Sequence, residues 1–196
     1  MIGAGIQAAM AELVARTSKS VLTVGDHRGG GAGVMLAGGI VVTNDHVARG
    51  SQMAVSLQDG PKVTATVIAR DADNDLAALY APGTRARPVD LADSSKLKVG
   101  QLVFALGHPL GWSYYPTAGI VSASPVEPGY ARGERGLLRL DVSLAPGNSG
   151  GPIVDSEGRL IGVACMITGP GISLAVPSAV VKEFANWARS RAPVAA

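Results

Sequence analysis

The chain lacks most features that would link it to a membrane, a metal or a nucleic acid. Its one cysteine, Cys165, excludes an internal disulfide bond and a metal site built from several cysteines. No apolar run approaches the length of a membrane span. With 17 Lys and Arg against 15 Asp and Glu, the net charge of +2 is too even to indicate nucleic acid or an anionic membrane as a partner.

The N-terminus also lacks the features of a secretion signal. Residues 1–7 contain no basic residue, and Glu12 soon interrupts the apolar residues. An initiating Met on a domain favours a cytoplasmic location. A periplasmic or secreted location is the alternative if a leader was removed.

Glycine and hydrophobic residues are abundant, with 26 glycines and 47% hydrophobic residues in 196. This composition suits a β-rich globular protein with many tight turns. Short β-branched segments recur between turn residues and predict an all-β fold. The expected strands form two sets of six: Val21–Val24, Ala32–Leu36, Ile40–Thr43, Gln52–Leu57, Val63–Arg70 and Leu76–Tyr80, then Leu102–Leu106, Ala118–Ala123, Leu137–Val142, Pro152–Val154, Leu160–Ile167 and Ile172–Val176.

These two sets fit two six-stranded antiparallel barrels within a single domain over residues 1–196. We expect the N-terminal barrel at about 18–92 and the C-terminal barrel at about 98–177, with Val89–Val99 bridging them. Short helices are expected at both ends. Residues 5–17 place Ile6, Met10 and Leu13 on one face, and Ser178 is expected to cap a final helix over residues 178–191.

Residues 145–154, Ala-Pro-Gly-Asn-Ser-Gly-Gly-Pro-Ile-Val, place Ser149 among small residues. A nucleophilic serine needs backbone N–H groups that converge on the substrate carbonyl oxygen, and a Cβ there would block the approach. Glycine supplies the space and the unusual φ values of such a loop. The alternative is an ordinary surface turn between two strands, since the same residues favour turns.

Two other segments supply a histidine and an aspartate beside apolar strands. Strand residues 39–43 run into His46, and Asp75 leads into the apolar residues 76–79. The order His, Asp, Ser is that of chymotrypsin-type proteases and differs from that of subtilisins and α/β-hydrolases. His27 lies in a polar turn and is expected to be solvated. His108 is expected to be a loop or pocket-wall residue.

Other carboxylates compete with Asp75 for the role of orienting the histidine. Asp71 and Asp73 are expected to be solvated turn residues, because neither leads directly into a strand. Asp45 adjoins His46, but adjacent residues on an extended chain point to opposite sides. It is the weaker candidate.

Three stretches, Val42-Thr43-Asn44-Asp45-His46-Val47, Asp75-Leu76-Ala77 and Pro146-Gly147-Asn148-Ser149-Gly150-Gly151-Pro152, occur in one order over nearly the whole chain. In these motifs the chain resembles the protease domain of the HtrA/Deg family of trypsin-like serine peptidases. The resemblance implies a chymotrypsin-like fold and a serine endopeptidase that forms an acyl-enzyme. His46 is then the base, Asp75 its orienter and Ser149 the nucleophile, with polypeptide substrates and no metal or cofactor.

The resemblance also implies where the oxyanion and the substrate side chain bind. The oxyanion hole is expected from the N–H groups of Gly147 and Ser149, with Asn148 setting the turn between them. Asn148 cannot form the ion pair that an aspartate makes in pancreatic zymogens, so activation by propeptide cleavage is not expected. The primary pocket is expected to have Ser143 at its base and Ile172, Ser173 and Leu174 in its wall, which favours small or medium aliphatic side chains. Asp141 would reach this pocket only in a regular strand.

Members of the HtrA/Deg family usually carry a PDZ domain after the protease, and we expect none within these 196 residues. We therefore do not expect the family's peptide-sensing regulation from this sequence. Two alternatives stay open: a latent protease that needs a regulatory partner or a homo-oligomer to order its loops, and a chaperone or binding module that kept the fold without turnover. Cys165 lies in an apolar strand and is expected to be a packed small hydrophobe.

Overall fold

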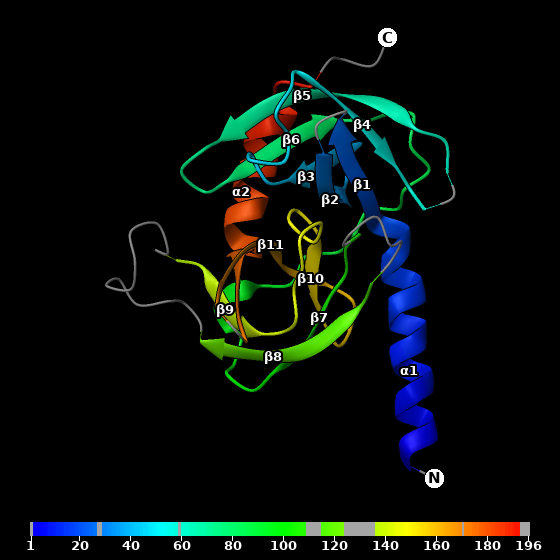
Figure 1. Cartoon of the computed structure of the whole chain (residues 1–196), viewed down its shortest axis with the longest axis vertical. Coiled ribbons are helices and arrows are strands. Elements are labelled where there is room, and N and C mark those ends of the chain that lie inside the picture. The colour runs from blue at the N-terminus through cyan, green and yellow to red at the C-terminus, as the bar shows by residue number, and fades with distance from the viewer. Residues whose placement is uncertain are drawn as a thin grey trace.

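The computed structural model describes residues 2–26, 29–58, 60–108, 115–123, 136–169 and 171–192. Its strands form two closed antiparallel barrels, stacked one above the other in Figure 1, so the predicted pair of six-stranded barrels is confirmed. The first barrel has the order β1-β2-β3-β6-β5-β4 and contains β1 (Val21–Asp26), β2 (Gly29–Leu36), β3 (Ile40–Thr43), β4 (Gln52–Ser56), β5 (Val63–Asp71) and β6 (Leu76–Tyr80). The second has the order β10-β11-β12-β9-β8-β7 and contains β7 (Leu102–Ala105), β8 (Thr117–Ala123), β9 (Leu138–Asp141), β10 (Pro152–Asp155), β11 (Leu160–Gly169) and β12 (Ile172–Pro177).

The apolar strands of the first barrel are buried on both faces. In β3, Val41 belongs to the core inside the first barrel. Its neighbours Ile40 and Val42 belong to another core, which also contains Leu160 and Val176 of the second barrel. Since one face fills a barrel and the other joins the two barrels, the strand is a continuous apolar run without polar alternation.

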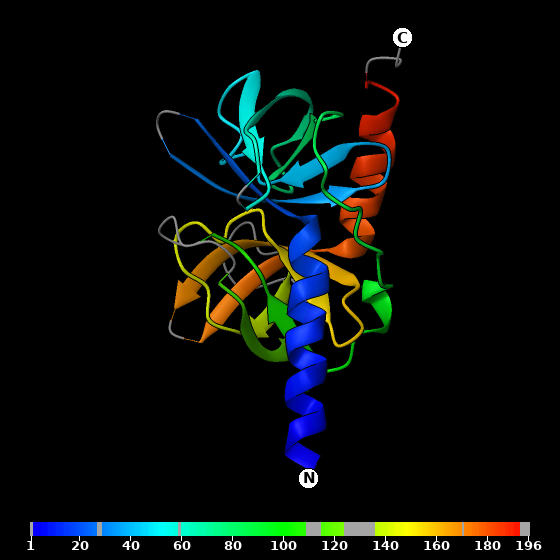
Figure 2. The same ribbon diagram turned by 90° about the vertical axis from the view of Figure 1, so that its right-hand side faces the viewer.

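Helix α2 (Ser178–Arg189) closes the core that the two barrels share. Its buried residues Val181, Phe184, Ala185 and Ala188 recur at the spacing of one helical face. This face packs against β3 and β6 of the first barrel and against β11 and β12 of the second. Figure 2 shows the helix running upward along the edge of the first barrel. The C-terminal helix therefore fixes the relative position of the two barrels.

The predicted capping role of Ser178 is wrong. Ser178 lies inside the helix, and the N-cap residue, Pro177, has no side chain that could accept a hydrogen bond. The Ser178 hydroxyl instead donates to the carbonyl of Ala92 at 2.7 Å. Ser94 supplies the missing acceptor, because its Oγ accepts from the N–H of Ala179 at 3.1 Å. The cap thus comes from the segment between the barrels, which includes the short 3₁₀ helix η2 (Ser94–Lys96).

That connecting segment is bonded to both barrels. The N–H of Val89 donates to the carbonyl of Met35 at 2.9 Å in the first barrel. Asp90 accepts from Leu160 at 2.7 Å, and Ala92 donates back to Leu160 at 2.9 Å in the second barrel. These bonds hold the two barrels in a fixed relative position where the chain crosses from the first to the second.

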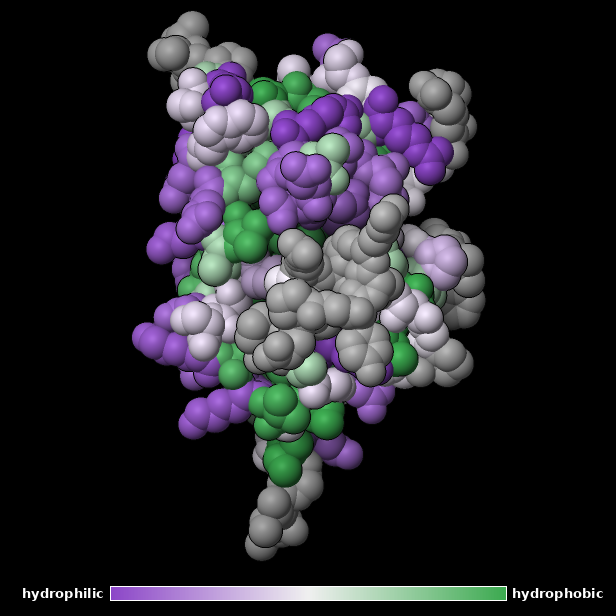
Figure 3. Space-filling view, turned by 90° about the vertical axis from the view of Figure 1, so that its left-hand side faces the viewer, coloured by the Kyte–Doolittle hydropathy of each residue, from purple (hydrophilic) through white to green (hydrophobic). Residues whose placement is uncertain are grey.

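Helix α1 (Ile2–Thr17) leads through the 3₁₀ helix η1 (Ser18–Ser20) into β1, and it begins before the predicted residue 5. Leu13 is buried against Phe104 and Val154 of the second barrel, whereas Ile6 is 56% exposed. Figures 1 and 2 show the N-terminal part of the helix projecting beyond that barrel, so the predicted apolar face is buried only toward its C-terminal end. On the side of the molecule drawn in Figure 3, hydrophobic residues gather toward the lower end of the surface. No helix in the described part of the chain has the length and hydropathy to cross a membrane.

Candidate active site

The segments that carry the three residues expected from the sequence lie close together between the two barrels. His46 follows β3 and Asp75 lies in the turn before β6, while Ser149 lies between β9 and β10 of the second barrel. Gly31 of β2 shows how close these segments are: a Cβ on it would lie 2.5 Å from the carbonyl oxygen of Ser149 and 3.0 Å from the side chain of Val47. The Ser149 carbonyl also accepts from the N–H of Ala32 at 2.8 Å. The serine loop is therefore bonded to the barrel that carries the histidine.

The carboxylate of Asp75 holds His46 by two separate groups. Its Oδ2 lies 2.8 Å from the imidazole Nδ1, and its Oδ1 lies 3.0 Å from the same nitrogen. The backbone N–H of His46 also donates to Oδ1 at 3.1 Å. A carboxylate on Nδ1 requires the proton on that nitrogen, which leaves Nε2 free to accept a proton.

The backbone of Asp75 is held in an unfavourable conformation. With φ of 51°, it is the one non-glycine in the left-handed region among the described residues. Its carbonyl oxygen accepts from Nδ2 of Asn44 at 3.0 Å, and Asn44 is fully buried. Asn44 and His46 lie on the same loop, so this loop binds both the backbone and the side chain of Asp75.

The competing carboxylates have other partners. Asp45 pairs with Arg70 of β5 at 2.5 Å, and Arg70 also donates to the carbonyl of Gly50 at 2.8 Å. Asp71 accepts from the backbone and side chain of Asn74 within its own turn. Asp73 is exposed in that turn. Of the four candidate carboxylates, Asp45, Asp71, Asp73 and Asp75, only Asp75 contacts the imidazole of His46.

The electrostatics of the pair follow from this geometry. The hydrogen bond from His46 to the Asp75 carboxylate raises the pKa of His46 above 6.5, against a partial burial that lowers it. The imidazolium form is stabilised because the carboxylate balances its charge. A base of this kind can hold a proton taken from a serine hydroxyl.

The loop that carries Ser149 is built on a tight turn. The N–H of Asn148 donates to the carbonyl of Ala145 at 3.0 Å, and Gly147 has φ of 103°. Pro at the second position and a positive φ at the third are the pattern of a type II turn. No described residue accepts from the N–H groups of Gly147 or Ser149. Two backbone donors thus remain available beside the serine hydroxyl, on either side of Asn148.

The glycines after Ser149 leave no room for a side chain. A Cβ on Gly150, whose φ is 84°, would lie 2.1 Å from the carbonyl oxygen of Ala32. The N–H of Gly150 donates to the carbonyl of Ala164 at 2.8 Å, and Ala164 donates back to Gly151 at 2.9 Å. The loop is therefore fastened to β11 and packed directly against the first barrel.

A cavity of about 270 Å³ adjoins Ser149. None of its described lining residues is charged: they are Leu144, Ala145, Pro146, Asn148, Ser149, Ala164, Cys165, Met166 and Ile167. The predicted lining by Ser143, Ile172, Ser173 and Leu174 is not the lining of this cavity.

The physical reason for this difference is that β11 lies between β12 and the cavity. Ser173 donates its hydroxyl to the carbonyl of Val142 at 2.7 Å, and Leu174 is buried in the core shared by the barrels. Ser143 is exposed, and its carbonyl accepts from Thr117. Ile172 is half-buried near the end of β11. Asp141 is exposed and also lies outside the lining.

Two further residues singled out in the sequence lie near the site. His108 is buried, which lowers its pKa, and it lines a larger cavity on the other side of Pro146. Cys165 lines the cavity beside Ser149, and burial raises the pKa of its thiol to about 12. The Cys165 thiol donates to the carbonyl of Leu174 at 3.4 Å. His27 lies outside the described residues.

The sequence model of the trypsin-like peptidase domain matches residues 31–163, which include His46, Asp75 and Ser149. The chain belongs to the trypsin-like peptidase family. Protease Do-like 1 of Arabidopsis thaliana chloroplasts is 35% identical over 171 residues, which are 80% of this chain and 39% of that protein. A probable periplasmic DegP-like serine endoprotease of Bartonella henselae is 40% identical over 152 residues, 74% of this chain and 30% of that protein.

A solved structure of the HtrA-type protease AlgW with a decapeptide superimposes with a TM-score of 0.84 at 26% identity. The superposition covers 92% of this chain and 67% of that one. The resemblance to HtrA/Deg proteases expected from the sequence is therefore confirmed. The chain spans between about 30% and 40% of the length of the curated relatives named above.

In this trypsin-like domain, sequence reasoning missed the supporting residues. Asn44 could have been found, because an amide between a buried strand and His46 has to satisfy its hydrogen bonds locally. Gly31 gave no signal beyond its place in a run of glycines. Among the described residues, no group of three or more His, Cys, Asp or Glu side chains is placed to hold a metal ion.

Proposed function

We propose that this domain is a serine endopeptidase that hydrolyses peptide bonds through an acyl-enzyme. His46 takes the proton of Ser149 as the hydroxyl attacks the substrate carbonyl, and it later gives the proton to the leaving amine. Asp75 orients the imidazole and balances the imidazolium. The observation that carries this proposal is the contact of the Asp75 carboxylate with both the ring Nδ1 and the backbone N–H of His46.

The oxyanion of the tetrahedral intermediate is bound by the N–H groups of Gly147 and Ser149. Support comes from the turn at residues 145–148, in which the N–H of Asn148 is used internally and the other two are not. Asn148 is therefore a spacer that shapes the turn and not a donor to the substrate. Two such donors stabilise the transition state because they are aimed before the charge develops.

The substrate is a polypeptide with a small or medium aliphatic residue before the cleaved bond. The apolar cavity beside Ser149 supports this, since an aliphatic side chain gains roughly 1.5–3 kcal/mol on leaving water. An Arg or Lys buried there without a carboxylate partner would cost several kcal/mol. Unfolded or flexible segments are the preferred substrates, because they expose such residues.

A serine-reactive fluorophosphonate probe tests the catalytic proposal. We expect the probe to label the wild-type protein and not the Ser149→Ala variant, whose fold should be retained since the residue is small and half-buried. Casein hydrolysis should disappear in the same variant. Appreciable turnover by Ser149→Ala would show that Ser149 is not the nucleophile.

The same probe separates the alternatives. A latent protease would be labelled only after addition of a partner or after oligomerisation, while a binding module would bind unfolded chains without labelling. Mapping the cleavage sites in a denatured proteome tests the substrate preference. A clear preference for Arg or Lys before the cut would contradict the apolar cavity as the primary pocket.

A further inference from the structure

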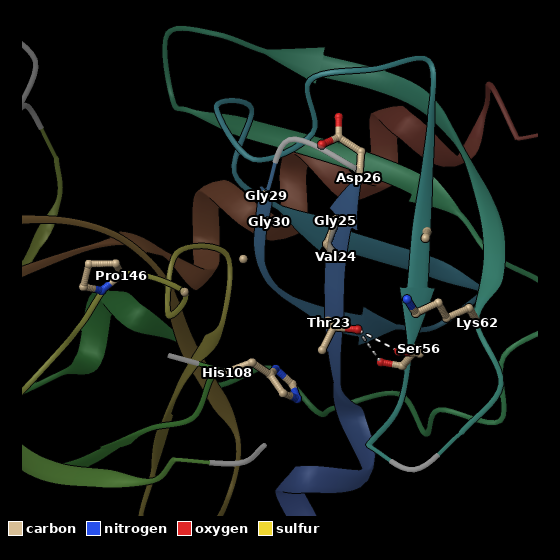
Figure 4. Close-up of a pocket in the computed structure, with 13 residues that line it drawn as sticks. Thr23, Val24, Gly25, Asp26, Gly29, Gly30, Ser56, Lys62, His108 and Pro146 are labelled. Atoms are coloured by element: carbon tan, nitrogen blue, oxygen red, sulfur yellow. Dashed lines mark hydrogen bonds between the residues drawn. The ribbon is translucent and has the colours of Figure 1, made fainter. Parts of the chain in front are cut away.

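A second and larger cavity, of about 820 Å³, lies on the other side of the turn that carries the oxyanion donors. Its lining is contributed by β1, β2, β4 and the loop before β5 of the first barrel and by loops of the second: Thr23, Val24, Gly25, Asp26, Gly29, Gly30, Gly31, Ala54, Ser56, Lys62, His108, Pro146 and Gly147. We call this cavity the hairpin groove, and Figure 4 shows its lining residues. Pro146 lines both this groove and the smaller cavity beside Ser149.

The hairpin groove begins at the nucleophile loop. Gly31 lines the groove and also packs against the backbone of Ser149. A polypeptide whose side chain before the cleaved bond occupies the small cavity must therefore continue past Gly147 on the opposite side of the turn. That continuation enters the groove.

The wall of the groove can receive an extended chain. Glycines 29–31 carry no side chains, and they pair with β1 through Gly25↔Gly30 and Asp26↔Gly29. β3 pairs only with Val34–Leu36 of β2 in the described structure, so no strand covers the other edge of these glycines. Main-chain groups of a bound peptide can pair with such an edge.

Two charged side chains line the groove, one basic (Lys62) and one acidic (Asp26). Lys62 is exposed and makes no ion pair with any residue that the structure describes. The other charged lining residue, Asp26, has an interaction of its own. In Figure 4, Asp26 lies at the far end of β1, whereas Lys62 extends beside β4 near Ser56. The hydroxyls of Ser56 and Thr23 are occupied with each other at 2.7 Å.

Building on the proposed peptidase function, we propose that the hairpin groove binds the residues that follow the cleaved bond and that Lys62 selects a carboxylate side chain there. The ammonium group would pair with Asp or Glu of the substrate within the second to fourth residue after the cut. Exposed ion pairs of this kind change binding by roughly two- to fivefold. Lys62 is then a specificity-determining residue of the leaving side, separate from the apolar selection before the cut.

The test uses quenched peptides that share one aliphatic acyl side and carry either Asp-Glu or Asn-Gln at the second and third positions after the cut. In the wild-type protein we expect kcat/KM to favour the acidic peptide by about threefold. The ratio should fall to about one in Lys62→Gln and invert in Lys62→Glu. Lys98→Gln, which removes the same charge from the connecting segment, should keep the wild-type ratio. High salt should bring the wild-type ratio to about one.

The same peptides are measured for binding to the Ser149→Ala protein by fluorescence anisotropy, with and without Lys62→Gln. A Lys62-dependent preference in binding, together with no hydrolysis of either peptide by the wild-type protein, would uphold the groove and reject the peptidase function. Hydrolysis with equal rates for both peptides, or with an acidic preference that survives Lys62→Gln, would overturn the groove proposal alone.

Discussion

Replacement of Gly147 by Ala tests the oxyanion hole through the backbone alone. Gly147 has φ of 103°, which an L-residue adopts at a cost of about 1–2 kcal/mol or more. In a type I turn the same position has φ near −90°, which Ala adopts freely. In the variant, the peptide group between Pro146 and residue 147 is therefore expected to flip, so that the turn becomes type I. The carbonyl of Pro146 would then replace the N–H of residue 147 at the substrate oxygen.

The magnitude follows from the loss of one donor. Removing a single oxyanion donor costs roughly 2.7–4 kcal/mol of transition-state stabilisation, so kcat should fall about 10²- to 10³-fold. The assay is steady-state hydrolysis of a quenched aliphatic peptide, together with the rate of fluorophosphonate labelling. KM should change far less than kcat, because the cavity beside Ser149 keeps its side chains.

A matched control separates strain from chemistry. Gly100 has φ of 86°, and a Cβ on it would meet no atom within 4 Å. Gly100→Ala should therefore lose a similar 1–2 kcal/mol of stability, measured by urea unfolding, while its turnover stays at the wild-type level. If Gly147→Ala retains wild-type kcat, the N–H of residue 147 does not bind the oxyanion and the assignment of the turn is wrong.

Three further predictions concern the residues around Ser149. Asp75→Asn should lower turnover by roughly 10⁴-fold, since an amide can hold the wrong imidazole tautomer, and unchanged kinetics would exclude Asp75 as the orienter. The raised pKa of His46 predicts that kcat/KM increases with pH around a midpoint above 6.5. It also predicts that the stabilisation of the fold by the His46–Asp75 pair is complete below pH 6.5 and is lost as the pH rises through the raised pKa. NMR titration of the imidazole checks that its pKa is raised, and the shift should be reversed in Asp75→Asn. Cys165, with a thiol pKa of about 12, should react with iodoacetamide at neutral pH roughly a thousandfold more slowly than a free thiol, and rapid alkylation of the folded protein would contradict its burial.

The strands could be predicted from the sequence where a continuous apolar run has a single interpretation, a strand that is buried on both faces. Residues 40–42 and 76–79 are apolar throughout, and the structure buries both faces of each strand there. The glycine hairpin was harder, because residues 29–31 have low strand propensity and pair with β1 only through their backbone. Strand β2 consequently begins at Gly29, before the predicted Ala32.

The motifs that carry His46, Asp75 and Ser149 could be recognised in the sequence, because each places a polar residue beside the end of a strand. The lining of the cavity beside Ser149 could not be read from the sequence, because it depends on which strand of the second barrel lies nearest to the serine. Residues 164–167 of β11 line the cavity, and the bonds of Ala164 to Gly150 and Gly151 place them there. A backbone hydrogen bond between segments that are distant in the sequence cannot be predicted from the spacing of residues.

The position of the site between the barrels has a consequence for how the site is held together. Gly150 packs against the carbonyl of Ala32, and the hydroxyl of Thr43 donates to that same carbonyl at 2.6 Å. Thr43 is followed by Asn44, which holds the backbone of Asp75. One chain of contacts thus runs from the loop of Ser149, through two strands of the first barrel, to Asp75, which contacts His46. A change that separates the barrels by a fraction of an ångström would disturb the proposed nucleophile and the proposed base together, because the loop of Ser149 and the segment of His46 are both bonded to Ala32 and its neighbours.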